Sequence, residues 1–173
     1  MHARTKGRLA GLAFILATGL MANAGPASES RDTVIDYALR DSTMSAAETA
    51  ASASLGRFLD VALDDTGTSH PDTGLKVAFQ TAEGRTEVIW VAPFVRDETG
   101  FAGLLANQPA YMPNAAGDLV AFGVDDIRDW YILGEDGRMY GSFTTRVMLA
   151  RMSPARAEAI RGYLSEAPLP ASW

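Results

Sequence analysis

The sequence predicts an α+β domain, in which helices at both ends of the chain cover a curled antiparallel sheet of about five to six strands. Three observations lead to this fold class. Apolar residues recur at steps of three and four over residues 41–63, which is the pattern of an amphipathic helix. Short alternating segments separated by turn residues follow over residues 75–143, which is typical of antiparallel strands. Helical spacing then returns after residue 143.

The first 24 residues have the parts of a secretory signal peptide. Arg4, Lys6 and Arg8 precede an uncharged apolar run of 14 residues, and the small-residue motif Ala-Asn-Ala follows at 22–24. The run is short compared with the roughly 20 residues that cross a bilayer. We therefore predict cleavage after Ala24 and a periplasmic or secreted protein. Because the sequence contains no cysteine, a lipid anchor on a cysteine is excluded.

Removal of this leader makes the chain strongly acidic. The whole sequence has 15 basic and 21 acidic residues, and the leader holds three of the basic ones, which leaves 12 against 21 and a net charge of −9. Nucleic acid and anionic lipid surfaces both attract positive charge, so we expect neither as a partner, and no membrane contact after cleavage. The remaining length suits a single domain.

The helical elements bracket the predicted sheet. Residues 25–31 are small and polar, which predicts a disordered lead-in to a domain over 32–152, with a possible first strand at 33–38. The helix over 41–63 has Asp41 or Ser42 as a possible cap, and its apolar stripe consists of Met44, Ala47, Ala51, Leu55, Phe58 and Ala62.

Strands are predicted between the helices, at residues 75–81, 86–92, 101–107, 119–123, 130–133 and 138–143. The strand over 86–92 has apolar residues on both faces, so we place it centrally in the sheet. A helix over 143–152 follows, with Thr144 as a possible cap. Residues 153–173 form a separate C-terminal helix and a proline-broken tail, and Ser153 with Pro154 marks the start of that helix.

Five motifs in this order resemble one bacterial family. They are EVIWV (87–91), FAGLLANQP (101–109), GDLVAF (117–122), DDIRDW (125–130) and GSFTTR (141–146). The chain resembles the domain of unknown function 2314, the YegJ-like family, over about residues 32–150, and the segment from Ser153 lies outside the resemblance. The resemblance implies an α+β domain and provides no known activity or catalytic residue.

Several chemistries lack their residues in this sequence. Cysteine is absent, and His70 is the single histidine after the leader, so thiolate sites and multi-histidine metal sites are excluded within one chain. No nucleotide-binding loop or nucleophile elbow follows a predicted strand. We therefore expect no catalytic residue, no cofactor and no metal, and we place His70 in an exposed loop.

An aspartate cluster is the first candidate site. Asp125, Asp126 and Asp129 could bind Ca²⁺ or Mg²⁺, which prefer oxygen ligands. Their spacing lacks the alternate order, glycine and distal glutamate of a calcium loop. We favour a helical turn between two strands, in which Asp125 caps the start and Ile127 and Trp130 face the core.

Asn107 and Trp90 are further candidates, because each lies in or beside a predicted strand. Asn107 could orient a ligand, although such residues more often bond their own backbone at a strand end. Trp90 and Trp130 could line a pocket, although we favour core positions for both.

Arg146 is the last candidate, as the single charge between Phe143 and Ala150. A guanidinium in an apolar segment needs a partner, because an unpaired buried charge costs several kcal/mol. We predict an ion pair with Asp129, with Asp126 as second choice. The alternative is a pocket in which Arg146 binds an anionic ligand.

These observations favour an exported, non-enzymatic binding or interaction module, whose partner is an unknown protein or small molecule. Two alternatives stay open. The many acids allow a carboxylate-dependent hydrolase with an acid and a base, and the small size allows an immunity-type protein that binds a toxin. The sequence leaves the oligomeric state open.

Overall fold

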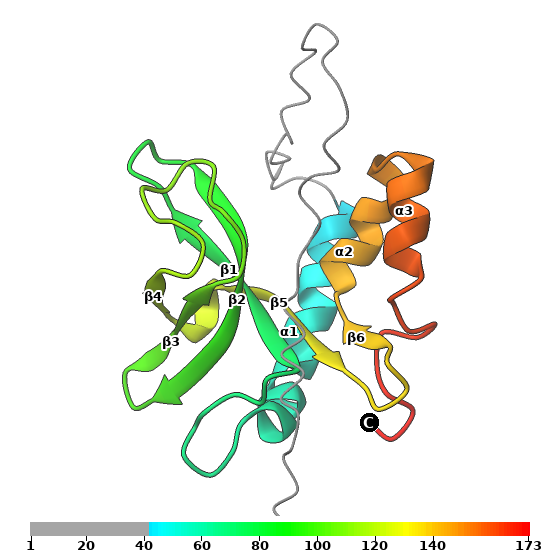
Figure 1. Cartoon of the computed structure of the whole chain (residues 1–173), viewed down its shortest axis with the longest axis horizontal. Helices are drawn as coiled ribbons and strands as arrows, with labels where there is room; N and C mark the ends of the chain where they lie inside the picture. Colours follow the sequence, from blue (N-terminus) through cyan, green and yellow to red (C-terminus); the bar gives the residue numbers. More distant parts are fainter. Residues whose placement is uncertain (1–41) are drawn as a thin grey trace, which may run out of the picture. The chain divides into compact units, whose positions relative to one another are not determined.

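The computed structural model describes residues 42–173 (Figure 1). The predicted signal peptide (1–24), lead-in (25–31) and first strand (33–38), and Asp41 as a helix cap, lie outside the described residues. In the described part, the elements follow in the order α1 (Ser42–Ala62), β1 (Thr73–Gln80), β2 (Thr86–Asp97), β3 (Gly100–Leu105), β4 (Leu119–Phe122), η1 (Val124–Asp126), β5 (Ile127–Leu133), β6 (Met139–Gly141), α2 (Phe143–Met148), η2 (Leu149–Arg151) and α3 (Pro154–Arg161).

The six strands form one open sheet in the order β4-β3-β2-β1-β5-β6, and every neighbouring pair is antiparallel. The predicted α+β fold class is therefore confirmed. Each strand predicted between residues 75 and 143 is present, and β2 lies within the sheet as expected. None of the helices in the described residues combines the length and the apolar character needed to cross a membrane.

The apolar stripe of α1 covers one face of the sheet. Ala51, Leu55 and Phe58 are buried, and the Phe58 ring stacks on Trp130 of β5 with 4.8 Å between centroids. Trp130 is fully buried, and its Nε1 donates to the carbonyl of Ala51, 3.1 Å away. Figure 1 shows α1 beside α2, on the side of the sheet where β5 and β6 lie. The expected packing of the N-terminal helix on strands is thus built around one tryptophan.

A β-bulge explains how β5 buries two residues at a spacing of three. Ile127 lies opposite Val77 and Trp130 lies opposite Leu75, so Arg128 is an extra residue without a partner in β1. The bulge returns Ile127 and Trp130 to the same face of the sheet. Both are buried as predicted, although they belong to a strand and not to the predicted helical turn.

The two edges of the sheet differ. Residues 163–173, here called the closing segment, run along β6. Met139 N donates to Tyr163 O (2.8 Å), Ser165 N donates to Met139 O (3.0 Å) and Gly141 N donates to Pro168 O (2.6 Å). The segment ends with Trp173 against Trp130, at 5.4 Å between ring centroids. At the other edge, β4 pairs with β3, and no strand of residues 42–173 pairs with its outer side.

Candidate functional site

Asp129 is the most deeply buried of the polar residues that the sequence singles out. It is fully buried in β5, beside the point where β6 stops at Gly141 and the chain turns into α2. Its Oδ1 accepts from Phe143 N (3.1 Å) and Trp130 N (2.9 Å), and its Oδ2 accepts from Thr144 N (2.8 Å) and Thr144 Oγ1 (2.6 Å). The first N–H groups of a helix have no partner within the helix. Asp129, which lies in strand β5, therefore caps the N-terminus of helix α2.

The residue that precedes α2 does not cap it. Ser142 adopts a left-handed conformation (φ 53°, ψ 38°), and its side chain makes no capping bond. Its hydroxyl is buried and makes no hydrogen bond among the described residues. Thr144, the predicted cap, is the second residue of α2 and donates to Asp129 instead.

Lys76 lies next to this cap. In the register of the sheet it stands between Trp90 of β2 and Asp129 of β5. Its Nζ donates to Thr144 Oγ1 (2.9 Å) and lies 5.4 Å from the centroid of the Trp90 ring. Burial lowers the pKa of Lys76, whereas the carboxylates of Asp129 and Glu48 favour its charged form.

The same environment acts on the two acids. Burial raises the pKa of Asp129, and Lys76 and the bonds from Thr144 oppose this change. Burial also raises the pKa of Glu48 in α1, against the nearby charges of Arg128 and Lys76. Sequence reasoning missed Lys76, because it reads only as the polar member of an alternating strand, and the register that sets it beside Asp129 is not visible in one strand.

Arg146 and Asp129 do not form the predicted ion pair, and Asp126 does not replace it. Arg146 Nε donates to Gly141 O (3.0 Å), Nη1 donates to Ser165 O (2.9 Å) and Nη2 donates to Ser165 Oγ (2.9 Å). The Asp129 oxygens accept from α2 and from Trp130 N, whereas two carbonyl groups and the Ser165 hydroxyl accept from the guanidinium. Burial lowers the pKa of Arg146, while the more distant Asp129 acts in the other direction. Arg146 thus ties α2 to β6 and to the closing segment.

The aspartates of the cluster separate into different roles. Asp126 Oδ2 accepts from Gly123 N (2.8 Å) and closes the 3₁₀ turn η1. A turn is therefore present but spans only Val124–Asp126, so the predicted turn over residues 124–130 is wrong in length; Asp126 and not Asp125 makes its bond, and Asp129 belongs to β5. Asp125 is exposed, and its carbonyl accepts from Arg128. Within residues 42–173, no group of three or more histidine or acidic side chains is arranged to hold a metal.

The structure brings Asn107 and Trp90 together, through the main-chain N–H of Trp90. Asn107 Oδ1 accepts from Trp90 N (3.2 Å), so the side chain bonds a neighbouring strand and not its own backbone. The Trp90 ring packs edge-on against Tyr131 at 5.2 Å and is only partly buried, whereas Trp130 is in the core. The predicted core position is correct for Trp130 and wrong for Trp90.

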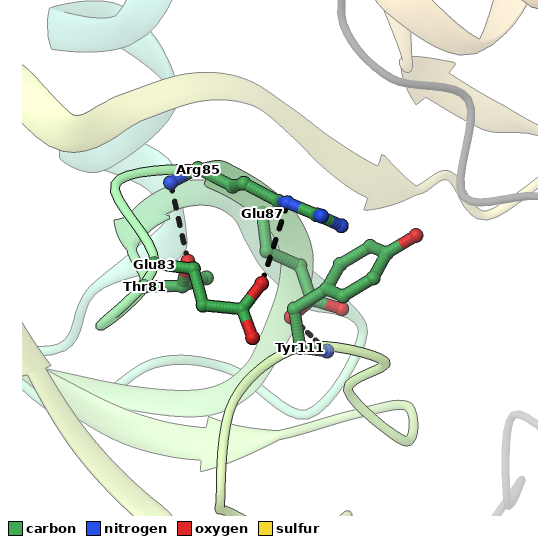
Figure 2. Close-up of polar contacts among 5 residues, drawn as sticks. All are labelled: Thr81, Glu83, Arg85, Glu87 and Tyr111. Atoms are coloured by element: carbon green, nitrogen blue, oxygen red, sulfur yellow. Dashed lines mark hydrogen bonds and ion pairs between the residues drawn. The ribbon is translucent and has the colours of Figure 1, made fainter.

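Glu87 is a buried, hydrogen-bonded acid that the sequence does not single out as a candidate. It is 2% exposed, and it accepts from Ala110 N (2.5 Å) and Tyr111 N (2.9 Å), which fixes the loop between β3 and β4. Figure 2 shows this contact beside Arg85, whose guanidinium lies over the Tyr111 ring at 4.9 Å. An indication was available, because alternation places Glu87 on the apolar face of β2 with Ile89.

An open cleft of about 400 Å³ lies away from all of these residues, beside the β5–β6 turn. Its lining comprises Val61, Ile132, Gly134, Glu135, Asp136, Tyr140, Pro170 and Trp173. Asp136 accepts from Tyr140 Oη (2.9 Å) and from Arg138 N (2.9 Å), and these bonds lower the pKa of Asp136. None of the predicted site residues faces this cleft. His70 is exposed in the loop after α1, as predicted.

Apolar side chains gather at the β4 end of the sheet, on the face opposite to α1. The register aligns Val95, Ala102 and Ala121 across three strands, and it sets Leu104 opposite Leu119. Leu119 is 70% exposed and Val95 is 42% exposed. We call these five residues the edge patch. It is the part of the described surface where exposed apolar side chains and an unpaired strand edge coincide.

The comparisons with known proteins identify a family. A family model described as "Uncharacterized protein conserved in bacteria (DUF2314)" matches residues 41–162. The match covers all of α3, which the motif resemblance had left outside. No curated protein and no solved structure matches the chain. The chain belongs to the DUF2314 family of uncharacterized bacterial proteins.

Proposed function

We propose that this chain is an exported, non-enzymatic binding module and that its partner is a protein that contacts the edge patch and strand β4. The exposed apolar patch beside the unpaired outer edge of β4 is the observation that carries this proposal. Exposed apolar patches on soluble domains mark interaction sites. Edge strands that do not serve for binding are usually very short, protected by charges or covered. β4 has the sequence Leu-Val-Ala-Phe and carries no charge.

The contrast with the other edge supports the proposal. The closing segment bonds to the main chain of β6 at Met139 and Gly141, so that edge is already occupied. The same sheet thus ends in one covered edge and one edge with exposed apolar side chains. The predicted signal peptide supports the exported setting, in which a small domain can meet partners outside the cytoplasm.

The internal bonds of the acids favour binding over hydrolysis. A carboxylate-dependent hydrolase needs an acid and a base that face one substrate across a separation of roughly 5–10 Å. Glu87, Asp126 and Asp129 each accept main-chain N–H groups of their own chain. They hold loops and a helix in place, which is a structural task. The hydrolase alternative rests instead on Glu135 and Asp136 of the β5–β6 turn, because these two acids line the open cleft.

Comparative affinity capture tests the proposal. The tagged protein is expressed in its host, and captured proteins from the periplasm are identified by mass spectrometry. Leu119→Lys adds a charge to the edge patch at a position that is 70% exposed, so it should leave the fold intact and abolish capture of the partner. Tyr163→Lys, at a position 67% exposed on the closing segment, is the matched control and should capture the same protein as the parent.

The identity of the captured protein decides whether the binding is immunity-type, because a toxin would then be the partner. If the parent and both variants capture the same proteins, the edge patch is not the binding surface. If a broad hydrolase screen finds a reaction product that the Glu135→Gln variant does not form, the protein is an enzyme and the binding proposal is wrong.

A further inference from the structure

We infer that the partner presents an extended, basic segment that adds to the sheet as a strand along β4. This inference rests on the proposed function and specifies what the edge patch binds. Strand addition requires three things of β4: free main-chain groups, room for alternate side chains, and a charge environment that selects one kind of segment.

The main chain of β4 has free groups on its outer side. Leu105 N donates to Asp118 O (3.0 Å), and antiparallel pairing directs alternate residues toward the neighbouring strand. In this register Val120 and Phe122 bond to β3, whereas Leu119 and Ala121 direct their N–H and C=O groups away from it. The run ends at Gly123, whose N–H donates to Asp126 Oδ2. The free stretch therefore suits a short guest strand.

The side chains of β4 favour apolar residues at alternate positions of the guest. Leu119 and Ala121 lie on the exposed face, next to Leu104 and Ala102 of β3. Guest side chains on that face would cover the edge patch. Phe122 points to the other face and is buried in the core, stacked on Phe101 at 5.6 Å. An alternating guest thus covers exposed apolar surface on one face without entering the core.

Acidic side chains lie at both ends of this edge. Asp118 precedes β4, and Asp125 follows it on the exposed turn η1. The β2–β3 turn brings Asp97 and Glu98 to the same end as Phe122, because Gly100 lies against the Phe122 carbonyl. These charges favour lysine or arginine at the ends of a guest strand.

Nearby basic side chains do not reverse this bias. Arg96 lies over the ring of Phe101, 5.8 Å from its centroid, and therefore on the core side of the sheet. Arg128 donates to the carbonyl of Asp125. Arg96 and Arg128 thus set two positive charges against the three acids Asp97, Glu98 and Asp125, which leaves this end net negative. A second copy of this chain is disfavoured as the guest, because its β4 would carry the same acids to the interface. The geometry and the charge together select a basic segment of another protein.

Defined peptides test the inference on the purified protein. The first is a peptide of about nine residues with valine at alternate positions and lysine at both ends, a length that spans an average strand and its flanks. The second carries glutamate in place of each lysine. The third repeats the first with its central amides N-methylated. We expect the lysine peptide to bind, the glutamate peptide to bind at least about tenfold more weakly, and the methylated peptide to lose binding.

Variants of the protein locate the binding. Leu119→Lys and Ala121→Pro should each weaken the lysine peptide by about tenfold or more, and Tyr163→Lys should leave it unchanged. Proline is acceptable at Ala121, because its N–H faces outward at an edge, and circular dichroism checks the fold of each variant. The double variant Glu98→Gln, Asp125→Asn should reduce the preference for the lysine peptide over the glutamate peptide.

Failures of the two proposals are distinguishable. If no peptide binds while Leu119→Lys still abolishes capture of the partner, the inference of a basic strand is wrong and the binding function stands. If Leu119→Lys changes neither result, both fail. Equal binding of the lysine and glutamate peptides overturns the charge argument, and self-association through Leu119, measured by sedimentation, overturns the choice of a foreign partner.

Discussion

At the scale of single residues, the polar side chains of this domain mostly bond to main-chain groups. Asp129 caps α2 from a neighbouring strand, Glu87 holds the loop before β4, and Arg146 gathers carbonyls from β6 and the closing segment. Each of these side chains joins segments that are distant in the sequence. A buried group of this kind is costly to remove, because its partners lose their bonds and stay buried.

The first prediction concerns Asp129. Asp129→Ala leaves three donors of Phe143 and Thr144 without an acceptor, and should lower the free energy of unfolding by about 3 kcal/mol or more. Asp129→Asn retains one acceptor oxygen and should cost about 2 kcal/mol. Urea denaturation measures both. The control is Asp125→Asn on the exposed turn, which should stay within about 0.5 kcal/mol of the parent; equal stability of all variants would disprove the capping role.

The second prediction concerns pH and Asp97. Its Oδ1 accepts from Thr99 N (2.7 Å), Thr99 Oγ1 (2.6 Å) and Gly100 N (3.1 Å), and these bonds lower the pKa of Asp97 below its ordinary value. A lowered folded-state pKa gives stability that is present above about pH 4, the unfolded pKa, and is lost as pH falls through the folded pKa.

The matching substitution is Asp97→Asn, which keeps the acceptor but cannot ionise. The parent should therefore be more stable than the variant near neutral pH, and the difference should shrink below about pH 4. Thermal melts of both proteins across this range measure the difference. The comparison cancels the titration of all other groups, including Asp129, whose pKa is shifted in the other direction. A difference that stays constant down to pH 2 contradicts the assignment.

At the scale of elements, the turn from β6 into α2 depends on a close approach of backbone. Gly141 has a φ of 73°, in the left-handed region, and a Cβ at this position would overlap the carbonyl oxygen of Trp130. Gly84, in the β1–β2 turn, has a φ of 72° with nothing within 4 Å of such a Cβ. The two glycines therefore have the same backbone conformation, but only at Gly141 would a side chain overlap neighbouring atoms.

The third prediction uses this matched pair. Gly84→Ala should cost about 1–2 kcal/mol, which is the penalty of the left-handed conformation alone. Gly141→Ala adds the overlap with Trp130 and should cost at least about 2 kcal/mol more. Chemical denaturation of both variants gives the difference. Equal losses of unfolding free energy in the two variants would mean that α2 can move away from β5 without cost. The bonds from Asp129 to α2 would then not hold the helix in a fixed position.

The elements also show what can be predicted from one sequence. The stripe of α1 and the alternation of β1 and β2 have periods that a single segment reveals, and these elements were predicted. The bulge at Arg128 has no such periodicity, so the sequence pattern places Asp129 in a turn and not in a strand. Lys76 meets Asp129 only through the register of two strands. The partners of Arg146 belong to the closing segment, whose path the sequence does not indicate, and so an ion pair was predicted in their place.

At the scale of the whole molecule, the closing segment links the covered edge to the core. Trp173 packs against Trp130, with 5.4 Å between the ring centroids, and Arg57 Cζ lies 5.7 Å from the centroid of the Trp173 ring. Arg57 also donates to Ser172 O (2.8 Å). The Trp173 ring is therefore one anchor of the segment that covers β6, beside the bonds of Arg57 and Arg146 to the same segment.

The fourth prediction is that Trp173→Ala weakens this closure. Loss of a partly buried tryptophan should lower the free energy of unfolding by about 2 kcal/mol. Hydrogen exchange of the Met139 and Gly141 amides should accelerate, because both donate to the closing segment. Leu169→Ala, on the same segment but more exposed, is the control and should change stability by less than about 1 kcal/mol. Unchanged exchange at both amides would refute the anchoring role.

The fifth prediction concerns export of the whole chain. Mature protein should accumulate outside the cytoplasm and begin at or near Gly25, because a basic region, a short apolar run and Ala-Asn-Ala precede that residue. N-terminal sequencing of periplasmic material measures this. Recovery of the chain on membranes with Met1 still present would refute cleavage.

The late position of the closing segment has a consequence for biosynthesis. Residues 163–173 leave the ribosome after every strand of the sheet, so a growing chain with β6 already made still exposes both lateral borders of the sheet. Such borders are templates for aggregation. During synthesis the chain therefore passes through a stage in which both edges of the sheet are open, and the edge at β6 closes only when residues 163–173 pair with it.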